Sequence, residues 1–232
     1  MSPSDHIICY CAVPHSRQNF AFAETLAGLS LFRQENLRAG YSEYMTRNDL
    51  WLVRHGETEW SAAGRHTSST DLALTAEGER KAATVGRLLG GKKFALVLAS
   101  PLRRALETCR LAGYSAHITP DLREWGYGSY EGLTTAQIQV ENPHWTIWTG
   151  TPPGGESAAE VAARADRVIA KALAASGDVA LFGHAHMLRV LAARWLELEP
   201  TNGRLFALST GSISILGYEH EARVLQMWNR TE

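Results

Sequence analysis

The sequence predicts a three-layer α/β/α fold with a mostly parallel central sheet. Short apolar runs of strand length alternate along the chain with segments of helical periodicity. Two of these runs, at residues 50–53 and 178–182, lead into glycine and histidine residues. Because right-handed crossovers make such strands parallel, their carboxyl ends meet at one edge of the sheet, where folds of this kind bind ligands.

Each element is predicted from a local signal. Apolar runs bounded by turn residues indicate strands, and Ser or Thr followed by acidic or amide residues indicates the start of a helix. The first half of the chain is predicted to form a strand at 50–53, a helix from 75 to a stop at 90–91, a strand at 94–99, a helix that opens at Ser100-Pro101 and a short strand at 116–119. Two helices follow, each opened by a capping box, a short one at 134–137 and a longer one at 157–160. The last elements are a strand at 178–182, an apolar helix from 187, and an antiparallel pair of final strands at 212–218 and 222–228.

Length and composition indicate one globular domain with a substantial core. The chain has 232 residues, 45% of them hydrophobic, and a formal net charge of −1. A charge so close to neutral gives no support for nucleic acid or an anionic membrane as a partner. The three cysteines, Cys9, Cys11 and Cys109, form no CxxC pair and no even framework, which fits the reducing cytoplasm. No apolar run in the sequence is long enough to span a bilayer.

The start of the chain is its least readable part. We expect an N-terminal extension at 1–44, accessory or poorly ordered, and the main domain at 45–232, because Met45 stands just before the first strand. The apolar run at 7–13 has no Lys or Arg before it, so it does not fit a secretory signal.

Charged side chains gather at the predicted strand ends. Two arginines, two histidines and one glutamate come from separate segments: Arg54, His55, Arg103, Glu124 and His184. Arginine forks bind phosphoryl oxygens, and Arg103 lies in a first helical turn, where free N–H groups favour an anion. A neutral histidine can attack phosphorus, while a second histidine donates hydrogen bonds to the phosphoryl oxygens. Glu124 is placed to protonate the leaving alkoxide and then to activate water, a chemistry that needs no metal and no cofactor.

The motifs around these residues resemble the phosphoglycerate mutase-like branch of the histidine phosphatase superfamily. The matching pieces are LVRHGETEW, LT-x-x-G, SPLRRALET and GHAH, which spread over residues 50–218. LREWGYGSYEGLTT, W-x-x-W and GGES are similar to the sedoheptulose-bisphosphatase type and the mycobacterial acid-phosphatase type within it. Ser61 stands where many mutase-like members carry Asn, which favours hydrolysis over mutase activity.

The resemblance implies a phosphoglycerate mutase-like fold and assigns roles to the five charged residues. It implies that His55 is the residue phosphorylated and that Glu124 is the proton donor. It also implies that the phosphate is held by Arg54, Arg103 and His184.

We expect the substrate to be contacted by loops over the strand ends. The expected contact residues are Ser61, Arg65, His66, Thr67, Tyr127, Trp145, Trp148 and His186. Trp145 and Trp148 are interpreted as pocket walls, with packing as the alternative at their i, i+3 spacing. His186 is interpreted as a pocket or helix-cap residue rather than a zinc ligand, because no further residue has metal-site spacing. Arg104 and Arg110 are interpreted as solvated helix charges.

Three functions are compatible with this pattern. The favoured one is a metal-independent phosphatase that hydrolyses small phosphomonoesters, sugar phosphates or bisphosphates, through a phosphohistidine on His55. A phosphoglycerate mutase would share its chemistry, and a non-catalytic binder of phospho-ligands is less well supported because nucleophile and acid are both present. The expected partner is the small phosphate ester itself, and a homodimer is the assembly considered.

Overall fold

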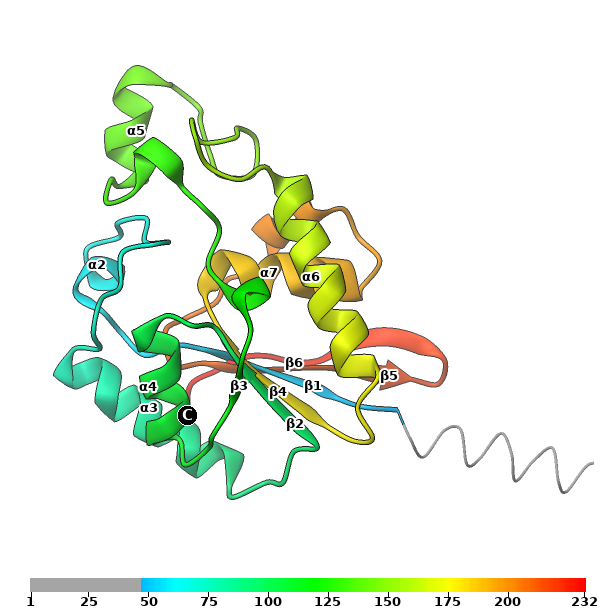
Figure 1. The fold of residues 1–232 in the computed structure, drawn as a ribbon. Helices are drawn as coiled ribbons and strands as arrows, with labels where there is room; N and C mark the ends of the chain where they lie inside the picture. Colours follow the sequence, from blue (N-terminus) through cyan, green and yellow to red (C-terminus); the bar gives the residue numbers. More distant parts are fainter. Residues whose placement is uncertain (1–46) are drawn as a thin grey trace, which may run out of the picture. The chain divides into compact units, whose positions relative to one another are not determined.

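A six-stranded sheet with the strand order β3-β2-β4-β1-β5-β6 forms the centre of the fold (Figure 1). The computed structural model describes residues 47–232. The strands are β1 Leu50–Arg54, β2 Leu96–Ala99, β3 His117–Ile118, β4 Val179–Gly183, β5 Ile213–Glu219 and β6 Ala222–Arg230. Neighbouring strands from β3 to β1 pair in parallel, whereas β5 is antiparallel to β1 and β6 to β5. The predicted fold class and the antiparallel final pair are therefore confirmed.

Helices cover both faces of the sheet, as the crossover rule requires. The α-helices are α2 Glu59–Ala62, α3 Ala76–Leu89, α4 Arg103–Leu111, α5 Thr135–Glu141, α6 Ala158–Leu173 and α7 Ala185–Trp195. Three short 3₁₀ helices are η1 Pro120–Leu122, η2 Gly128–Tyr130 and η3 Pro200–Leu205. Figure 1 shows α3 and α4 on one side of the strands and α6 and α7 on the other.

Two apolar cores result from the alternation of side chains along the strands. On β4, Leu181 belongs to the larger core with α6 and α7, while Phe182 belongs to the smaller core with α3 and α4. Cys109 of α4 is buried in the smaller core, and burial raises the pKa of its thiol to about 12. This agrees with the core stripe expected for that helix.

Helix starts follow the predicted caps in three of four cases. Thr75, Thr134 and Ser157 each accept a hydrogen bond from the backbone three residues on, the last two within complete capping boxes. The fourth prediction was wrong, because α4 begins at Arg103 with Leu102 as its N-cap. The hydroxyl of Ser100 lies 2.8 Å from Nε2 of His184 and also accepts from the backbone N–H of Leu102 at 3.4 Å, so the side chain contacts the site although it is not the N-cap of α4.

Two predictions from the sequence concern residues before 47. The extension at 1–44, and its boundary with the main domain, lie outside the residues that the structure describes.

Within 47–232, no helix is both long and apolar enough to cross a bilayer.

Candidate functional site

His55 comes directly after β1 and is almost fully buried. Its Nδ1 lies 2.6 Å from the carbonyl oxygen of Gly56. A carbonyl oxygen can only accept, so Nδ1 carries the hydrogen and Nε2 of the neutral ring keeps its lone pair. Among the described residues, Nε2 has no hydrogen-bond partner, and His55 lines a pocket. The ring is therefore presented as a nucleophile through Nε2.

The surroundings of His55 keep its ring neutral. Burial lowers the pKa of His55 well below its ordinary value of 6.5, and the positive charges of Arg104 and Arg54 lower it further. The hydrogen bond to Gly56 acts in the opposite direction but is the smallest of these causes. A neutral imidazole is the form that can attack phosphorus.

His184 follows β4 and faces His55 across the same sheet edge. The two ring centroids are 5.0 Å apart. Nδ1 of His184 accepts a hydrogen bond from Nε of Arg104 at 3.2 Å, so Nε2 carries the hydrogen and donates it to Ser100. Burial lowers the pKa of His184 well below 6.5, with Arg104 as the second cause.

Arg104 is fully buried and tied to the loop that precedes α3. Its guanidinium donates to the carbonyl oxygens of Thr67, Ser68 and Thr70 at 3.0–3.2 Å, in addition to His184. The prediction that Arg104 is a solvated helix charge was wrong, whereas Arg110 is exposed as predicted.

The structure does not bring Arg103 into this cluster. Its side chain is 59% exposed and pairs with Glu107 one turn along α4, at 3.1 Å. Only its backbone N–H is engaged nearby, with Asp71 at 2.7 Å. Consecutive helical residues point about 100° apart, so only one of two neighbouring arginines can face the sheet edge. That residue is Arg104, and the prediction for Arg103 is corrected accordingly.

Arg54, the last residue of β1, supplies a second guanidinium. It donates through one terminal nitrogen to the carbonyl oxygen of Leu208. Its Nε is buried and has no partner among the described residues. Neither Arg54 nor Arg104 forms an ion pair with a carboxylate in the described part of the chain. Two buried cations beside a neutral histidine make a site that favours an anion.

Glu124 is held at the N-terminus of α7. Its Oε1 accepts from the backbone N–H groups of Trp125 and Met187, both at 2.9 Å, and its Oε2 accepts from that of His186 at 3.1 Å. The loop that carries it is fixed by Arg164, which donates to the carbonyl oxygens of Asp121 and Arg123. The carboxyl group is therefore fixed in position and buried beside the cluster.

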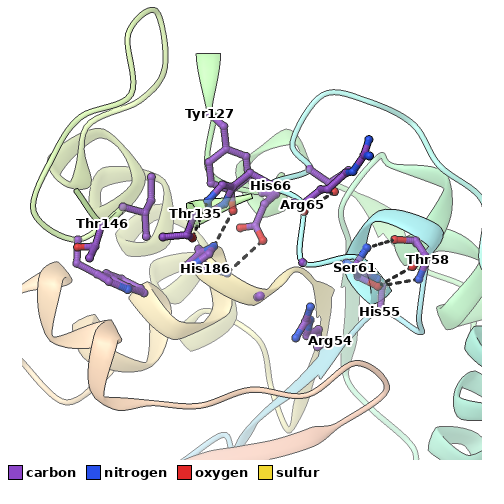
Figure 2. Close-up of a pocket in the computed structure, with 16 residues that line it drawn as sticks. Arg54, His55, Thr58, Ser61, Arg65, His66, Tyr127, Thr135, Thr146 and His186 are labelled. Atoms are coloured by element: carbon purple, nitrogen blue, oxygen red, sulfur yellow. Dashed lines mark hydrogen bonds between the residues drawn. The ribbon is translucent and has the colours of Figure 1, made fainter. Parts of the chain in front are cut away.

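A pocket of about 390 Å³ is lined by Arg54, His55 and Glu124 of this cluster, whereas Arg104 and His184 lie buried outside its lining (Figure 2). Besides Arg54, His55 and Glu124, the predicted contact residues that line it are Ser61, Arg65, His66, Thr67, Tyr127, Trp148 and His186. Figure 2 shows His66, Tyr127, Thr135 and His186 together on one side, with His55, Thr58 and Ser61 on the other. The phosphate end of a substrate would thus lie on the side of His55, and its leaving group on the side of His186.

Trp145 does not line the pocket, contrary to the prediction. Its ring packs edge-on against His66 and Tyr130, at centroid distances of 5.7 and 5.0 Å. Its indole N–H donates to the carbonyl oxygen of Gly150 at 3.1 Å. Trp145 therefore supports the wall from behind, whereas Trp148 forms part of the wall itself.

Sequence reasoning missed residues that hold the cluster from outside. The carboxylate of Glu131 accepts from the backbone N–H groups of Ser68 and Thr70 at 2.9–3.1 Å, which fixes the loop whose carbonyls bind Arg104. Thr108 accepts from the backbone N–H of Gly56 at 2.9 Å. A lone Glu in a loop and a helical Thr carry no signal of their own in a single sequence. Thr58, Thr135, Thr146 and Ile147, which also line the pocket, were not predicted either.

No group of three or more His, Cys, Asp or Glu side chains within residues 47–232 is arranged to hold a metal ion. His186, the residue weighed as a zinc ligand, has its Nδ1 2.6 Å from the hydroxyl of Tyr127. It lies at the second position of α7 and lines the pocket, so it is a pocket residue.

This geometry, a buried neutral histidine with Nε2 unpartnered in the described part of the chain beside two buried guanidinium groups, is compatible with phosphoryl transfer. Residues 50–231 match the family model of the histidine phosphatase superfamily (branch 1), and the chain belongs to this superfamily. An acid phosphatase of Mycobacterium tuberculosis is 46% identical over 187 residues, which cover 78% of this chain and 92% of the relative. Sedoheptulose 1,7-bisphosphatase of Saccharomyces cerevisiae is 32% identical over 63% of this chain and 67% of the relative.

Solved structures agree with this assignment. The structure of a Mycobacterium tuberculosis open reading frame product superposes with a TM-score of 0.76 at 44% identity, covering 79% of this chain and 98% of that one. Mycobacterial glucosyl-3-phosphoglycerate phosphatase with VO₃ gives a TM-score of 0.71 at 29% identity, with coverage of 78% and 98%. The chain is thus a phosphatase, a hydrolase that acts on phosphate esters.

The arginine cluster predicts how inorganic phosphate binds. Arg104→Lys keeps a positive charge but loses the planar fork, so we expect phosphate affinity to fall about tenfold or more. Arg103→Lys should leave the affinity unchanged, because the side chain of Arg103 lies outside the cluster. Calorimetric titration of both variants measures this. An affinity loss confined to the Arg103 variant would contradict the placement.

The histidines predict a dependence of stability on pH. Burial lowers the pKa of His55, His184 and His186 well below 6.5, so below pH 6.5 the unfolded chain binds protons that the folded chain does not. The free energy of unfolding should therefore be highest above pH 6.5 and fall as the pH is lowered. We expect a slope steeper than the roughly 1.4 kcal/mol per pH unit that one histidine supplies. Urea unfolding from pH 7.5 to 5.5 measures it, with His186→Gln as a variant of smaller slope. A flat profile would show that these rings bind protons in the folded chain at the same pH as in the unfolded chain.

Proposed function

We propose that this chain is a metal-independent phosphatase that hydrolyses small phosphomonoesters, sugar phosphates or bisphosphates, through a phosphohistidine on His55. The observation that carries the proposal is the hydrogen bond between Nδ1 of His55 and the Gly56 carbonyl, which leaves Nε2 as the free nucleophile. The buried guanidiniums of Arg54 and Arg104 support it, because they suit the dianionic phosphoryl group.

In the first step, Nε2 of His55 bonds to phosphorus while the bond from phosphorus to the ester oxygen breaks. The leaving alkoxide takes a proton from the carboxyl group of Glu124. Oε2 of Glu124 accepts one backbone hydrogen bond, whereas Oε1 accepts two, which favours Oε2 as the oxygen that carries this proton.

In the second step, water attacks the phosphoryl group and the bond to Nε2 breaks. Glu124, now a carboxylate, takes a proton from that water, so phosphate leaves and the starting state is restored. Every proton in this cycle is moved by Glu124. The developing charge on the phosphoryl oxygens is stabilised by donors that are already in place, which is the main electrostatic contribution expected of such a site.

The size and lining of the pocket support small esters. A volume of about 390 Å³ suits a small ligand, and the lining combines Trp148 with hydroxyl-bearing residues such as Thr135 and Thr146. Relatives named sedoheptulose 1,7-bisphosphatase and glucosyl-3-phosphoglycerate phosphatase, the second 30% identical over 177 residues, act on sugar derivatives by their names.

A mutase is the second candidate. A 2,3-bisphosphoglycerate-dependent phosphoglycerate mutase of Gloeobacter violaceus is 32% identical over 65% of this chain and 77% of that relative. Mutases and phosphatases of this kind share the phosphohistidine and differ in whether water reaches it. Ser61 stands where many mutase-like members carry Asn, and this difference favours hydrolysis.

The remaining inferences concern setting and extent. We propose that the phosphatase acts in the cytoplasm, which the cysteine pattern supports, and without a nucleic-acid or membrane partner, which the net charge of −1 supports. A homodimer is the assembly to look for by sedimentation. We also propose that residues 45–232 form the catalytic domain, which the family match over 50–231 supports.

The proposed function predicts turnover that a chelator does not remove. With excess chelator, the wild type should release phosphate from an aryl phosphate ester and from sugar bisphosphates. His55→Ala should lower kcat/KM about a thousandfold or more, because the nucleophile is gone. His117→Ala is the matched control, since His117 is exposed on the short edge strand β3.

Phosphate release is measured for all three proteins over the same panel. If the wild type shows no release but moves phosphate between glycerate positions, the mutase is correct. If it binds the esters and turns over none of them, the non-catalytic binder is correct.

A further inference from the structure

The wall of the pocket away from His55 contains a histidine that the phosphoryl chemistry does not use. His186 lines the pocket, and its ring packs between Trp148, at a centroid distance of 5.2 Å, and Tyr127, at 5.9 Å. Its Nδ1 lies 2.6 Å from the hydroxyl of Tyr127, a contact that Figure 2 marks with a dashed line. Both rings are therefore held in one arrangement.

The protonation of this pair follows from its surroundings. Burial raises the pKa of Tyr127 well above its ordinary value of 10, and the nearby charge of Glu124 raises it further. Burial lowers the pKa of His186 well below 6.5, followed by the charge of Arg189. Both partners are thus neutral, and one hydrogen lies between the two heavy atoms.

The direction of that hydrogen bond follows from counting acceptors. Tyr127 finds no acceptor for its O–H other than His186 within residues 47–232. If Nδ1 donated, the tyrosine hydrogen would be left without a partner in a buried position, which costs free energy. Tyr127 therefore donates, Nδ1 accepts, and the hydrogen of the His186 ring resides on Nε2. No described residue accepts from Nε2, which belongs to a pocket-lining ring.

The backbone of His186 also contacts Glu124, the proposed general acid. The backbone N–H of His186 donates to Oε2 of Glu124 at 3.1 Å. The backbone of His186 therefore binds the carboxyl group of Glu124, and its side chain lines the pocket. A substrate hydroxyl next to the ester oxygen would lie beside both.

We propose that His186 is a specificity-determining residue, which donates a hydrogen bond from Nε2 to a hydroxyl of the leaving alcohol, and that Tyr127 is the positioning residue that fixes this tautomer. The substrate class follows: esters of polyhydroxylated alcohols are preferred over esters of plain alcohols. The inference rests on the proposed function. The rest of this wall agrees with it, because Nε2 of His66 and the hydroxyl of Thr135, 3.3 Å apart, are further neutral hydrogen-bonding groups.

The test compares two substrates of equal chain length, glycerol 3-phosphate and n-propyl phosphate, which differ in their hydroxyls. The measured quantity is the ratio of their kcat/KM values. His186→Ala should lower this ratio about tenfold, the worth of a well-placed hydrogen bond, because kcat/KM falls further for glycerol 3-phosphate than for n-propyl phosphate. His186→Gln, which still carries an N–H donor, should restore part of the ratio.

Tyr127→Phe should lower the ratio about threefold or more, because the ring of His186 loses the donor that fixes its tautomer. Tyr130→Phe is the matched control. The Tyr130 hydroxyl lies in the same loop but accepts from Asn142 at 3.1 Å, away from the pocket, so its removal should leave the ratio unchanged.

If kcat/KM fell by the same factor for both substrates in the His186 and Tyr127 variants, the inference would be overturned and the proposed function would stand. If the wild type hydrolysed neither these two esters nor an aryl phosphate, the proposed function and the inference would both be overturned. A second measurement is independent of turnover. The nitrogen-15 spectrum of His186 in the full-length wild type should show hydrogen on Nε2, and hydrogen on Nδ1 would overturn the inference.

Discussion

The hydrogen bond from Nδ1 of His55 to the Gly56 carbonyl decides which ring nitrogen can react, and much of the structure serves to keep it in place. Gly56 donates its own N–H to Thr108, and a Cβ at position 56 would lie 2.2 Å from the carbonyl oxygen of Gly78. The strand end is thus pressed onto the first turn of α3 at a place where only glycine fits. The carbonyl that orients His55 has little freedom to turn away.

Positive charge is the second constraint, and within residues 47–232 neither Arg54 nor Arg104 forms an ion pair with a carboxylate. The guanidinium of Arg104 donates to backbone carbonyls and to His184 and forms no ion pair within residues 47–232, although Glu124 and Asp71 act on its charge from further away. Glu131 acts one step further out, on the N–H groups of the same loop. The charge therefore remains available to a phosphoryl group and at the same time keeps His55 neutral. A carboxylate placed against Arg104 would weaken both effects.

The sequence predicted what depends on local pattern and missed what depends on the phase of a helix or the path of a loop. β1 and β4 were recognisable as apolar runs, so His55 and His184 at their ends were placed correctly. The choice between Arg103 and Arg104 depends on which residue of α4 faces the sheet. The apparent cap at Ser100 set the start of that helix too early, because its hydroxyl binds His184 instead.

Loop residues show the same limit. Trp145 and Trp148 lie three residues apart in one loop. The turn that returns the indole N–H of Trp145 to Gly150 places the Trp145 ring behind the pocket wall, whereas the Trp148 ring forms part of it. Glu131 gives no sequence signal because its role is defined by two N–H groups about sixty residues earlier in the chain. Such roles become visible only when the loops are placed in three dimensions.

The central claim is that the phosphoryl group passes through Nε2 of His55. Rapid mixing with a ³²P-labelled ester, followed by an alkaline quench, tests it most directly, because a phosphohistidine survives base and is lost in acid. The phosphohistidine mechanism predicts stoichiometric label on His55, located on Nε2 by NMR, and no label in His55→Ala. Label on Nδ1 or on a carboxylate, or steady release of phosphate from a protein that never carries label, would contradict it.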